Sequence, residues 1–384
     1  MSGKTKVRGA LSTPQVAPDT FTTGTRDTTE LLVSRLLPDD DPALDTDRQA
    51  AFRTRSSQAE LPETEPEKVR VRDVLYHIGT IRKRKAPGPD GIFPDVFRGA
   101  ADVFAPCLAD LYTECLRQGT FPAPWKEGRL VILLKNPSKD PLQPKSYRPI
   151  NLLNVNGKLF EKVIKELLEK SLAEPLAPEH FGFMQGKCTS DAIFQLGYRV
   201  RHNDAKYVAA LFVDISGAFD NLWWPALLTR LGEQRIPQYL YNIIKDYLTQ
   251  RRVSVSGPEG IYWKDVTRGC PQGSVLGPFL WNLVMDTCIK LIKPHVYDVL
   301  AYADDLLIIW QASSRKGIEE TGRTVSALLD EWCEENKMTA APAKSAVMVF
   351  PRPGKPGLQR HPIIKIAGKT SGGEGDSLSV GHPR

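Results

Sequence analysis

Residues 299–310 read Val-Leu-Ala-Tyr-Ala-Asp-Asp-Leu-Leu-Ile-Ile-Trp, and this pattern sets the architecture that we predict for the chain. Strong β-formers stand on both sides of Asp304 and Asp305, which predicts two strands with the aspartates at the tip of a tight hairpin. Aspartate is a common turn residue, so turn chemistry alone is one explanation of the pair. Adjacent carboxylates repel each other, however, and Asn-Gly or Asp-Gly is the usual two-residue turn. A bound cation is the second explanation.

A third aspartate ends the most apolar strand that the sequence predicts. Residues 207–213 are almost all apolar, which indicates a strand in the interior of a sheet, and Asp214 follows it. If the hairpin pairs with this strand, Asp214 converges with Asp304 and Asp305. Three carboxylates at one place require divalent cations, and oxygen ligands suit Mg²⁺ or Mn²⁺. Two such ions roughly 3.5–4 Å apart can activate a hydroxyl and stabilise a leaving phosphate oxygen, so the inferred chemistry is phosphoryl transfer.

The elements around these strands favour an α+β fold. Strands alternate with helices, but hairpins are interspersed, which is typical of a split βαβ unit with helices on one face of a mostly antiparallel sheet. The predicted strands are 129–134, 207–213, 253–256, 261–268, 299–303, 306–310 and 346–350, and the predicted helices include 157–172, 189–201, 224–231, 239–248, 275–291 and 318–336.

Composition excludes several classes of protein. The chain has 384 residues, 41% hydrophobic and 25% charged, which is ordinary for a globular protein and excludes collagen-like, wholly disordered and coiled-coil chains. The net charge of 51 − 45 = +6 permits a polyanionic partner without requiring one. The six cysteines form no C-x-x-C pair and are too few for a disulfide scaffold. With no signal peptide and no apolar run near ~20 residues, we expect a soluble, intracellular protein without a membrane partner.

An abrupt change of charge marks a boundary near residue 67. Residues 39–67 carry nine acids and three arginines, a net charge of −6, whereas residues 68–85 carry seven bases and one acid, a net charge of +6. We expect residues 1–66 to be a disordered or loosely structured linker. The basic run Arg82–Lys85 has three possible explanations: a nuclear signal, a phosphate contact or a solvated helix end.

Five segments, in this order along the chain, resemble the motifs of reverse transcriptases. Two of them are similar to finger motifs, and the first of these is typical of the non-LTR (LINE-type) retrotransposon branch. The resemblance covers about three quarters of the chain, and no single motif would be specific by itself. The segments are Lys-Ala-Pro-Gly-Pro-Asp-Gly (85–91), Tyr-Arg-Pro-Ile (147–150), motif A at 212–220 (Phe-Val-Asp-Ile-Ser-Gly-Ala-Phe-Asp), motif B at 268–274 (Arg-Gly-Cys-Pro-Gln-Gly-Ser) and motif C at 301–305 (Ala-Tyr-Ala-Asp-Asp).

The resemblance implies a polymerase palm, with a ferredoxin-like antiparallel sheet, together with fingers. Fingers would occupy 67–206 and the palm 207–350, while 351–384 would be a truncated, flexible end without a thumb domain. The chain is thereby identified as the fingers–palm portion of a pol-like polyprotein. The full-length element would carry an endonuclease upstream, which we expect to be absent from this chain.

The resemblance also implies a role for individual residues. Asp214 and Asp304 would bind two Mg²⁺ or Mn²⁺ ions, with Asp305 as a weaker partner and the carbonyl of Ile215 as a further ligand. Phe219 would be the steric gate that excludes a ribose 2′-hydroxyl. The remaining predicted site residues are Gln272 and Gly273 in the nucleotide pocket, Lys135 and Arg148 on the triphosphate, and Lys344 as a proton donor to pyrophosphate.

Two points depart from the family pattern or stay open. Family members carry Asn shortly before the lysine that corresponds to Lys344, whereas residues 340–343 here are Ala-Ala-Pro-Ala. The sequence leaves two roles for Trp223 and Trp224, which are base stacking and core packing.

The activity implied is that of an RNA-directed DNA polymerase, which adds deoxynucleotides to the 3′-hydroxyl of a DNA primer on an RNA template, with the nucleus as the expected compartment. The alternative is a truncated, catalytically silent remnant that binds nucleic acid. A third possibility, a group II intron maturase or telomerase, is disfavoured by residues 85–91.

Overall fold

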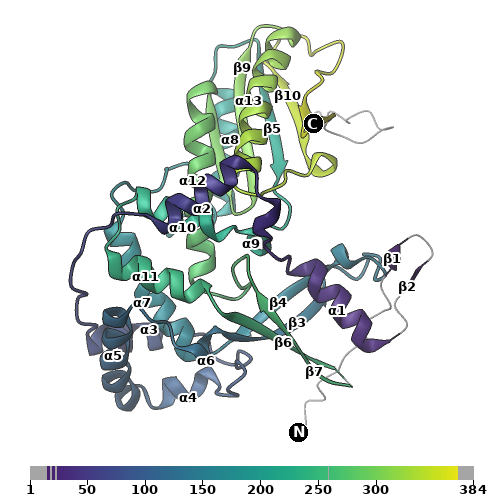
Figure 1. Cartoon of the computed structure of the whole chain (residues 1–384). Helices are drawn as coiled ribbons and strands as arrows, with labels where there is room; N and C mark the ends of the chain where they lie inside the picture. The colour runs from purple at the N-terminus through teal and green to yellow at the C-terminus, as the bar shows by residue number, and fades with distance from the viewer. Residues whose placement is uncertain (1–14, 18–19, 22–23, 258, 371–384) are drawn as a thin grey trace. The chain divides into compact units, whose positions relative to one another are not determined.

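The computed structural model describes residues 15–17, 20–21, 24–257 and 259–370 (Figure 1). The chain divides into two compact units, each assembled from segments that are far apart in the sequence. The first unit comprises Met1–Pro42, Glu60–Ser171 and Arg235–Gly277, and the second comprises Ala43–Ala59, Leu172–Gln234 and Pro278–Arg384.

The first unit is built on a four-stranded mixed sheet. Its strand order is β4-β3-β6-β7, with β3 antiparallel to β4 and parallel to β6. Pro149 lies in β4, where its missing N–H is tolerated because β4 is an edge strand. The strands are β3 (Glu127–Leu134), β4 (Tyr147–Leu153), β6 (Arg251–Gly257) and β7 (Gly260–Val266), and a separate pair is β1 (Gln15–Ala17) and β2 (Thr20–Phe21).

Helices of the first unit enclose an aromatic core. The ring of Phe160 stacks on Phe121 and Tyr112, with ring centroids 5.6 and 4.8 Å apart. Such contacts combine a large buried apolar area with a preferred ring geometry. The helices are α1 (Thr25–Leu36), α3 (Val71–Gly79), α4 (Pro94–Gly99), α5 (Ala101–Gln118), α6 (Ala123–Lys126), α7 (Val155–Ser171) and α11 (Gln238–Leu248), with a 3₁₀ turn η2 (Pro144–Ser146).

The second unit contains a four-stranded antiparallel sheet in the order β10-β5-β9-β8. The apolar strand and the hairpin predicted from the sequence are therefore neighbours, and β5 pairs with β9 along its whole length. The strands are β5 (Tyr207–Asp214), β8 (Asp298–Tyr302), β9 (Asp305–Ala312) and β10 (Ala346–Pro351), followed by the short pair β11 (Lys365–Ile366) and β12 (Lys369–Thr370).

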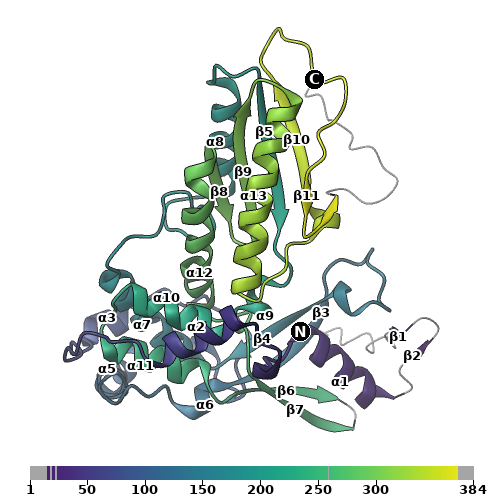
Figure 2. The same cartoon turned by 45° about the horizontal axis from the view of Figure 1, so that its top comes forward.

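Both faces of this second sheet are buried. Val208 and Ala209 point to opposite faces of β5, yet both are 1% exposed or less. Leu196 and Val200 of α8 pack on one face, and α13 lies on the other, in front of the strands in Figure 2. The expectation of helices on one face is therefore wrong, because a continuous apolar strand requires cover on both sides. The helices are α2 (Asp47–Ser57), α8 (Thr189–Arg201), α9 (Ala218–Asn221), α10 (Trp224–Glu233), α12 (Leu276–Ile292, which begins in the first unit) and α13 (Arg315–Glu335), with 3₁₀ turns η1 (Pro42–Leu44), η3 (Lys293–His295) and η4 (Pro342–Lys344).

The linker expected over residues 1–66 is folded in much of its described part. Val33 of α1 is fully buried against Leu130, Val253 and Val255 of the first sheet. Helix α2 begins with a capping box between Thr46 and Gln49. The composition of this region is polar, but its helices are stabilised by partners far away in the sequence, which composition does not report. Residues 1–14 lie outside the described residues.

Within the second unit, Asp45 attaches α2 to the end of α13. The Asp45 carboxylate is 4% exposed and forms ion pairs with both Arg53 and Lys337. These two cations lie 5.2 and 5.0 Å from the ring centroid of Trp223, which is 1% exposed. Trp223 is therefore a core residue, so core packing is the explanation that holds for it.

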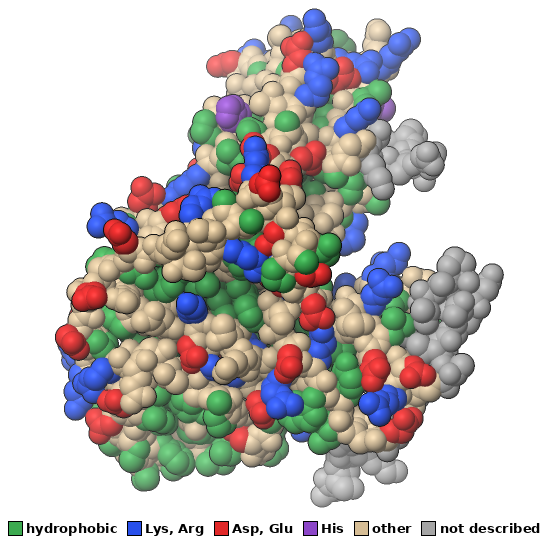
Figure 3. Space-filling view, in the orientation of Figure 1, with side chains coloured by type: hydrophobic (Ala, Val, Ile, Leu, Met, Phe, Trp, Pro, Cys, Tyr) green, Lys and Arg blue, Asp and Glu red, His purple; other side chains and the backbone are tan. Residues whose placement is uncertain are grey.

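The expected flexible end, 351–384, is only partly described. Ile364 and Ile366 are buried, and Ile366 belongs to the β11–β12 hairpin. Residues 371–384, the last part of this end, lie outside the described residues. Among the residues that are described, no helix has the length and apolar character needed to cross a membrane. On the face drawn in Figure 3, acidic and basic side chains are interspersed, in keeping with the modest net charge of +6.

Candidate active site

The carboxyl end of β5 meets the start of β9. Asp214 is the last residue of β5 and pairs in register with Asp305, the first residue of β9. The N–H of Ile215 donates to the carbonyl of Asp304 over 3.4 Å. The structure therefore brings together the three aspartates that the sequence predicted to converge.

The hairpin turn is one residue earlier than the sequence suggested. Tyr302 pairs with Asp305, so the two-residue turn consists of Ala303 and Asp304, and Asp305 already belongs to a strand. Ala303 has φ +58°, a left-handed conformation that Gly, Asn or Asp adopts more readily than Ala. Strained backbone of this kind persists only where surrounding contacts hold it.

The electrostatics of the three aspartates reflect their crowding. Burial, followed by the negative charges of Asp304 and Asp214, raises the pKa of Asp305. Lys344, in η4, acts in the opposite direction, and its Nζ lies 2.9 Å from Oδ2 of Asp214. The site therefore combines excess negative charge with one cation already held against it.

The donor atoms suit a hard divalent cation, although they are not gathered into a ready cluster. Within the described ranges, no group of three or more His, Cys, Asp or Glu side chains has an arrangement able to hold a metal ion. Oxygen ligands are nevertheless the chemistry that Mg²⁺ and Mn²⁺ prefer. The ammonium group of Lys344 on Asp214 is a stand-in that shows where a cation is attracted.

Phe219 lies close to this turn in the second unit, on the short helix α9. Its half-buried ring is 5.7 Å from the ring of Phe183, edge-on at 82°, and 6.1 Å from the ring of Trp281. Both separations are within the range of aromatic pairs in protein cores. The Phe219 ring thus has two aromatic neighbours, the fully buried Trp281 and Phe183, which is 49% exposed.

Four predicted site residues belong to the first unit. Leu133 of β3 pairs with Arg148 of β4, and Lys135 lies two residues after Leu133. Cross-strand partners share a face of the sheet, and so do residues two apart, so the exposed Lys135 and Arg148 lie on one face. The Nζ of Lys135 donates to the carbonyl of Lys145 over 3.0 Å.

Gln272 and Gly273 are held against β4. The N–H of Asn151 donates to the carbonyl of Gln272 over 2.8 Å. Gly273 has φ +128°, and a Cβ there would lie 2.4 Å from the carbonyl oxygen of Asn151. Only glycine fits this close approach, so the residue at this position is explained by steric hindrance.

Glu161 supports the same loop and was not identified from the sequence. Its carboxylate is 1% exposed and accepts hydrogen bonds from the hydroxyl of Ser274 and from the N–H groups of Val275 and Leu276. These donors stand at the N-terminus of α12, where unpaired N–H groups and the helix dipole favour an anion. Glu161 and Ser274 are 113 residues apart, and nothing in either local sequence indicates the pairing.

Comparisons with known proteins show which family the chain belongs to. Residues 134–370 match the family model described as reverse transcriptase (RNA-dependent DNA polymerase). The chain is 35% identical, over 309 residues, to the putative 115 kDa protein in type-1 retrotransposable element R1DM of Drosophila melanogaster, which covers 80% of this chain and 30% of that protein.

Two further relatives carry names of the same kind. The retrovirus-related Pol polyprotein from type-1 retrotransposable element R1 of Bradysia coprophila is 35% identical over 79% of this chain and 30% of its own length. The RNA-directed DNA polymerase from mobile element jockey of Drosophila melanogaster is 29% identical over 73% of this chain and 32% of its own length. The chain thus spans about a third of these relatives. The resemblance seen in the motifs is confirmed, and the chain belongs to the reverse transcriptase family, in the branch of the non-LTR retrotransposons.

Proposed function

We propose that this chain carries the catalytic centre of an RNA-directed DNA polymerase, with fingers in residues 67–206 and a palm in residues 207–350. The observation that carries the proposal is the in-register pair of Asp214 and Asp305 at the meeting point of β5 and β9, with Asp304 in the adjoining turn. Three carboxylates at the end of an otherwise apolar sheet are costly to fold unless they serve a cation.

The family generally uses divalent metal ions, and we assign two Mg²⁺ or Mn²⁺ ions to this site. Asp214, Asp304, Asp305 and the carbonyl of Ile215 would hold them. When bound, such ions promote attack by a hydroxyl and stabilise a leaving phosphate oxygen. The protein itself contributes a fixed hairpin, since the carbonyl of Asp304 accepts from the N–H of Ile215.

Phe219 would act as the steric gate beneath the sugar of the incoming nucleotide. A bulky ring that cannot move away leaves no room for a 2′-hydroxyl, and Phe183 and Trp281 restrict this ring. Gln272 and Gly273 would line the nucleotide pocket, in a loop fixed by Asn151.

Three cations would act on the phosphates. Lys135 and Arg148 share an exposed face of the first sheet, which suits them to bind a triphosphate. Lys344 would donate a proton to the leaving pyrophosphate, and its ammonium group, 2.9 Å from Asp214, supports this role.

A reverse transcriptase requires a nucleic-acid template and nucleotide substrates. We propose an RNA template, a DNA primer and deoxynucleotides, with an endonuclease elsewhere in the full-length element. Work on chromosomal DNA would take place in the nucleus, and the four exposed bases Arg82–Lys85 offer either a nuclear signal or a phosphate contact.

Single-nucleotide primer extension on an RNA template, with Mg²⁺ or Mn²⁺, tests the proposal. We expect addition of the complementary deoxynucleotide by the wild type and no addition by the Asp304→Asn/Asp305→Asn double variant. Retained RNA binding without addition in the wild type would favour the catalytically silent remnant instead.

A further inference from the structure

Phe219 is in contact with two aromatic rings, and one of them, Trp281, also reaches the turn of the aspartates. Trp281, on α12, is fully buried, and its ring is 6.1 Å from that of Phe219. The Nε1–H of the same side chain donates to the carbonyl of Ala303 over 2.8 Å. A single side chain therefore touches both the proposed gate and the turn that contains Asp304.

This hydrogen bond lies at a strained position. Ala303 has φ +58°, which costs free energy for a residue with a Cβ. Its carbonyl is fixed by an indole that cannot rotate away, because Trp281 is enclosed on all sides. Loss of the indole N–H would leave the strained turn with one fewer restraint.

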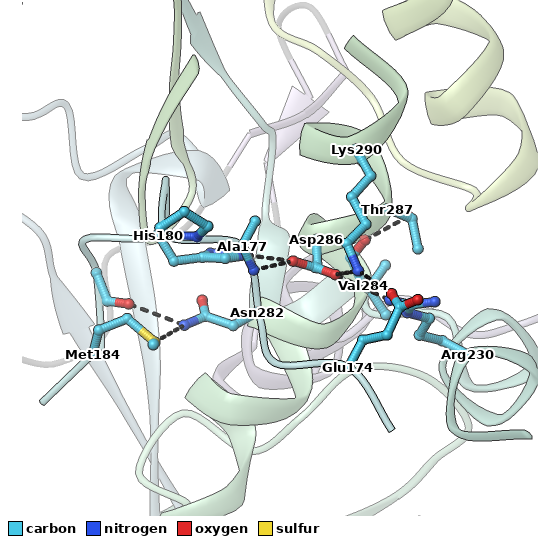
Figure 4. A network of polar contacts seen from close by, with 12 residues as sticks. Glu174, Ala177, His180, Met184, Arg230, Asn282, Val284, Asp286, Thr287 and Lys290 are labelled. Carbon is cyan, nitrogen blue, oxygen red and sulfur yellow. Dashed lines mark hydrogen bonds and ion pairs between the residues drawn. The ribbon is translucent and has the colours of Figure 1, made fainter. Parts of the chain in front are cut away.

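Phe183 is the second ring in contact with Phe219, and although its side chain is 49% exposed, the segment that carries it is held by backbone contacts. Gly182 packs so closely on the turn that a Cβ there would lie 2.1 Å from the backbone nitrogen of Ala303. The side chain of Asn282, which directly follows Trp281, donates to the carbonyl of Gly182 over 3.0 Å (Figure 4). Phe183 itself has φ +60°, a conformation that is maintained only by such contacts.

A buried ion-pair network fixes the other end of this segment. The Asp286 carboxylate, which is fully buried, accepts from the N–H of Ala177 over 2.7 Å and lies 3.0 Å from Arg230 and 3.1 Å from Lys290 (Figure 4). His180 lies 3.5 Å from the same carboxylate. Helix α12 therefore holds both ends of the segment, at Ala177 through Asp286 and at Gly182 through Asn282.

We propose that Trp281 and Phe183 are positioning residues that determine how strictly the site selects deoxynucleotides over ribonucleotides. They restrict the ring of Phe219, and Trp281 couples that ring to the aspartate turn through Ala303. This inference rests on the proposed polymerase function and on Phe219 as the gate. It adds that the gate is a three-ring unit, in which neither Trp281 nor Phe183 needs to touch the nucleotide.

The test compares Trp281→Phe with Trp332→Phe in the full chain. Trp332 is 2% exposed, and its Nε1–H donates to Thr287 of α12 over 2.8 Å, so its variant loses an equivalent buried hydrogen bond away from the gate. Phe183→Leu is paired with Phe194→Leu, because Phe194 is an exposed ring on α8. The readout is the ratio of kcat/KM for a deoxynucleotide to kcat/KM for the matching ribonucleotide, which does not depend on the fraction of folded enzyme.

We expect Trp281→Phe and Phe183→Leu to lower this ratio by about three- to tenfold, the loss that one hydrogen bond or ring contact brings. Trp332→Phe and Phe194→Leu should leave it unchanged. An unchanged ratio in both gate variants, while Phe219→Ala lowers it, would overturn the inference and leave the polymerase function intact.

If nucleotide addition is slow, equilibrium binding of the deoxynucleotide and the ribonucleotide in the presence of Ca²⁺ tests the positioning role separately from the polymerase function. Weaker preference for the deoxynucleotide in Trp281→Phe would support the inference even without catalysis. Wild-type binding with no preference between the sugars would overturn it. Failure of the wild type to bind either nucleotide would overturn the proposed function as well.

Discussion

The carboxylate of Glu161 lies 2.7 Å from the hydroxyl of Ser274 and joins α7 to the start of α12. Two backbone N–H groups, those of Val275 and Leu276, donate to the same oxygen over 2.5 and 3.0 Å. A buried anion thus caps the helix that directly follows Gln272 and Gly273. The loop proposed to contact the nucleotide therefore depends on a residue outside every recognised motif.

Glu161→Ala should destabilise the protein, because the backbone N–H groups of Val275 and Leu276 lose their acceptor and the hydroxyl of Ser274 is left with only Tyr247 as an acceptor. We expect a loss of about 3 kcal/mol in the free energy of unfolding and a higher KM for deoxynucleotides. Urea denaturation and steady-state kinetics measure the two effects. Glu169→Gln, on the exposed side of α7, is the matched control and should change stability by less than about 0.5 kcal/mol. Equal behaviour of the two variants would contradict the capping role.

Lys344→Gln should slow nucleotide addition by about 10²-fold, since a general acid contributes ~10²–10⁴-fold to a rate. It should also lower the Mg²⁺ concentration for half-maximal activity, because Lys344 no longer competes for Asp214. Single-turnover rates across a Mg²⁺ titration report both changes. Lys316→Gln on α13, with an 84% exposed side chain, serves as control. If both variants retain the wild-type rate, Lys344 is not the proton donor.

The lowered pKa of Asp286 predicts a loss of folding stability in acid. Burial alone would raise its pKa, but the neighbouring His180, the N–H of Ala177, which donates to it, and the charge of Lys290 lower the pKa from 3.8 to about 2. A lowered pKa stabilises the folded state above pH 3.8, and this contribution, about 2 kcal/mol, is lost as the pH falls toward 2. Urea midpoints between pH 5 and pH 2.5 should therefore fall less steeply in Asp286→Asn than in the wild type. The same slope in both proteins would show that Asp286 is not the responsible carboxylate.

Asp45 tests whether α2 is an integral part of the second unit. Its hydrogen bond to Arg53, opposed by burial and aided by Lys337, lowers its pKa, so the carboxylate is charged at neutral pH. Asp45→Asn should cost about 2–3 kcal/mol, because Arg53 and Lys337 lose a buried counter-charge. Asp47→Asn, an exposed neighbour in the first turn of α2, should cost less than about 1 kcal/mol. Equal thermal unfolding temperatures for the two variants would show that α2 is a loose linker and not an integral part of the second unit.

Elements with strong periodicity were predicted well from the sequence. The helix predicted at 189–201 is α8 with the same bounds, and the predicted strand 207–213 is β5 with Asp214 added. The spacing of their apolar residues is a local property, so it can be recognised in a single sequence. The convergence of Asp214 with Asp304 was predicted by assuming that the two apolar strands pair. That pairing is confirmed, with Asp305 as the residue opposite Asp214.

Elements fixed by distant partners were not predicted. Strand β4 was missed because Pro149 weakens its strand pattern, and its edge position, which tolerates proline, is a property of the sheet. Helix α2 has few apolar residues, and its Arg53 is joined through the preceding Asp45 to Lys337, which is distant in the sequence. The predicted position of the turn was wrong by one residue, because Ala303 adopts a left-handed conformation that alanine does not favour. Glu161 and Trp281 act through contacts that no local pattern encodes.

The catalytic role of the carboxyl end of β5 is tested by the single-turnover rate of template-directed nucleotide addition in Asp214→Asn beside Asp204→Asn. Both substitutions neutralise one aspartate of the second unit, but Asp204 is fully exposed and lies before β5. We expect Asp214→Asn to lose at least about 10³-fold in rate, which corresponds to several kcal/mol of lost transition-state stabilisation, while Asp204→Asn keeps the wild-type rate. Equal rates in the two variants would show that the end of β5 is not the catalytic centre.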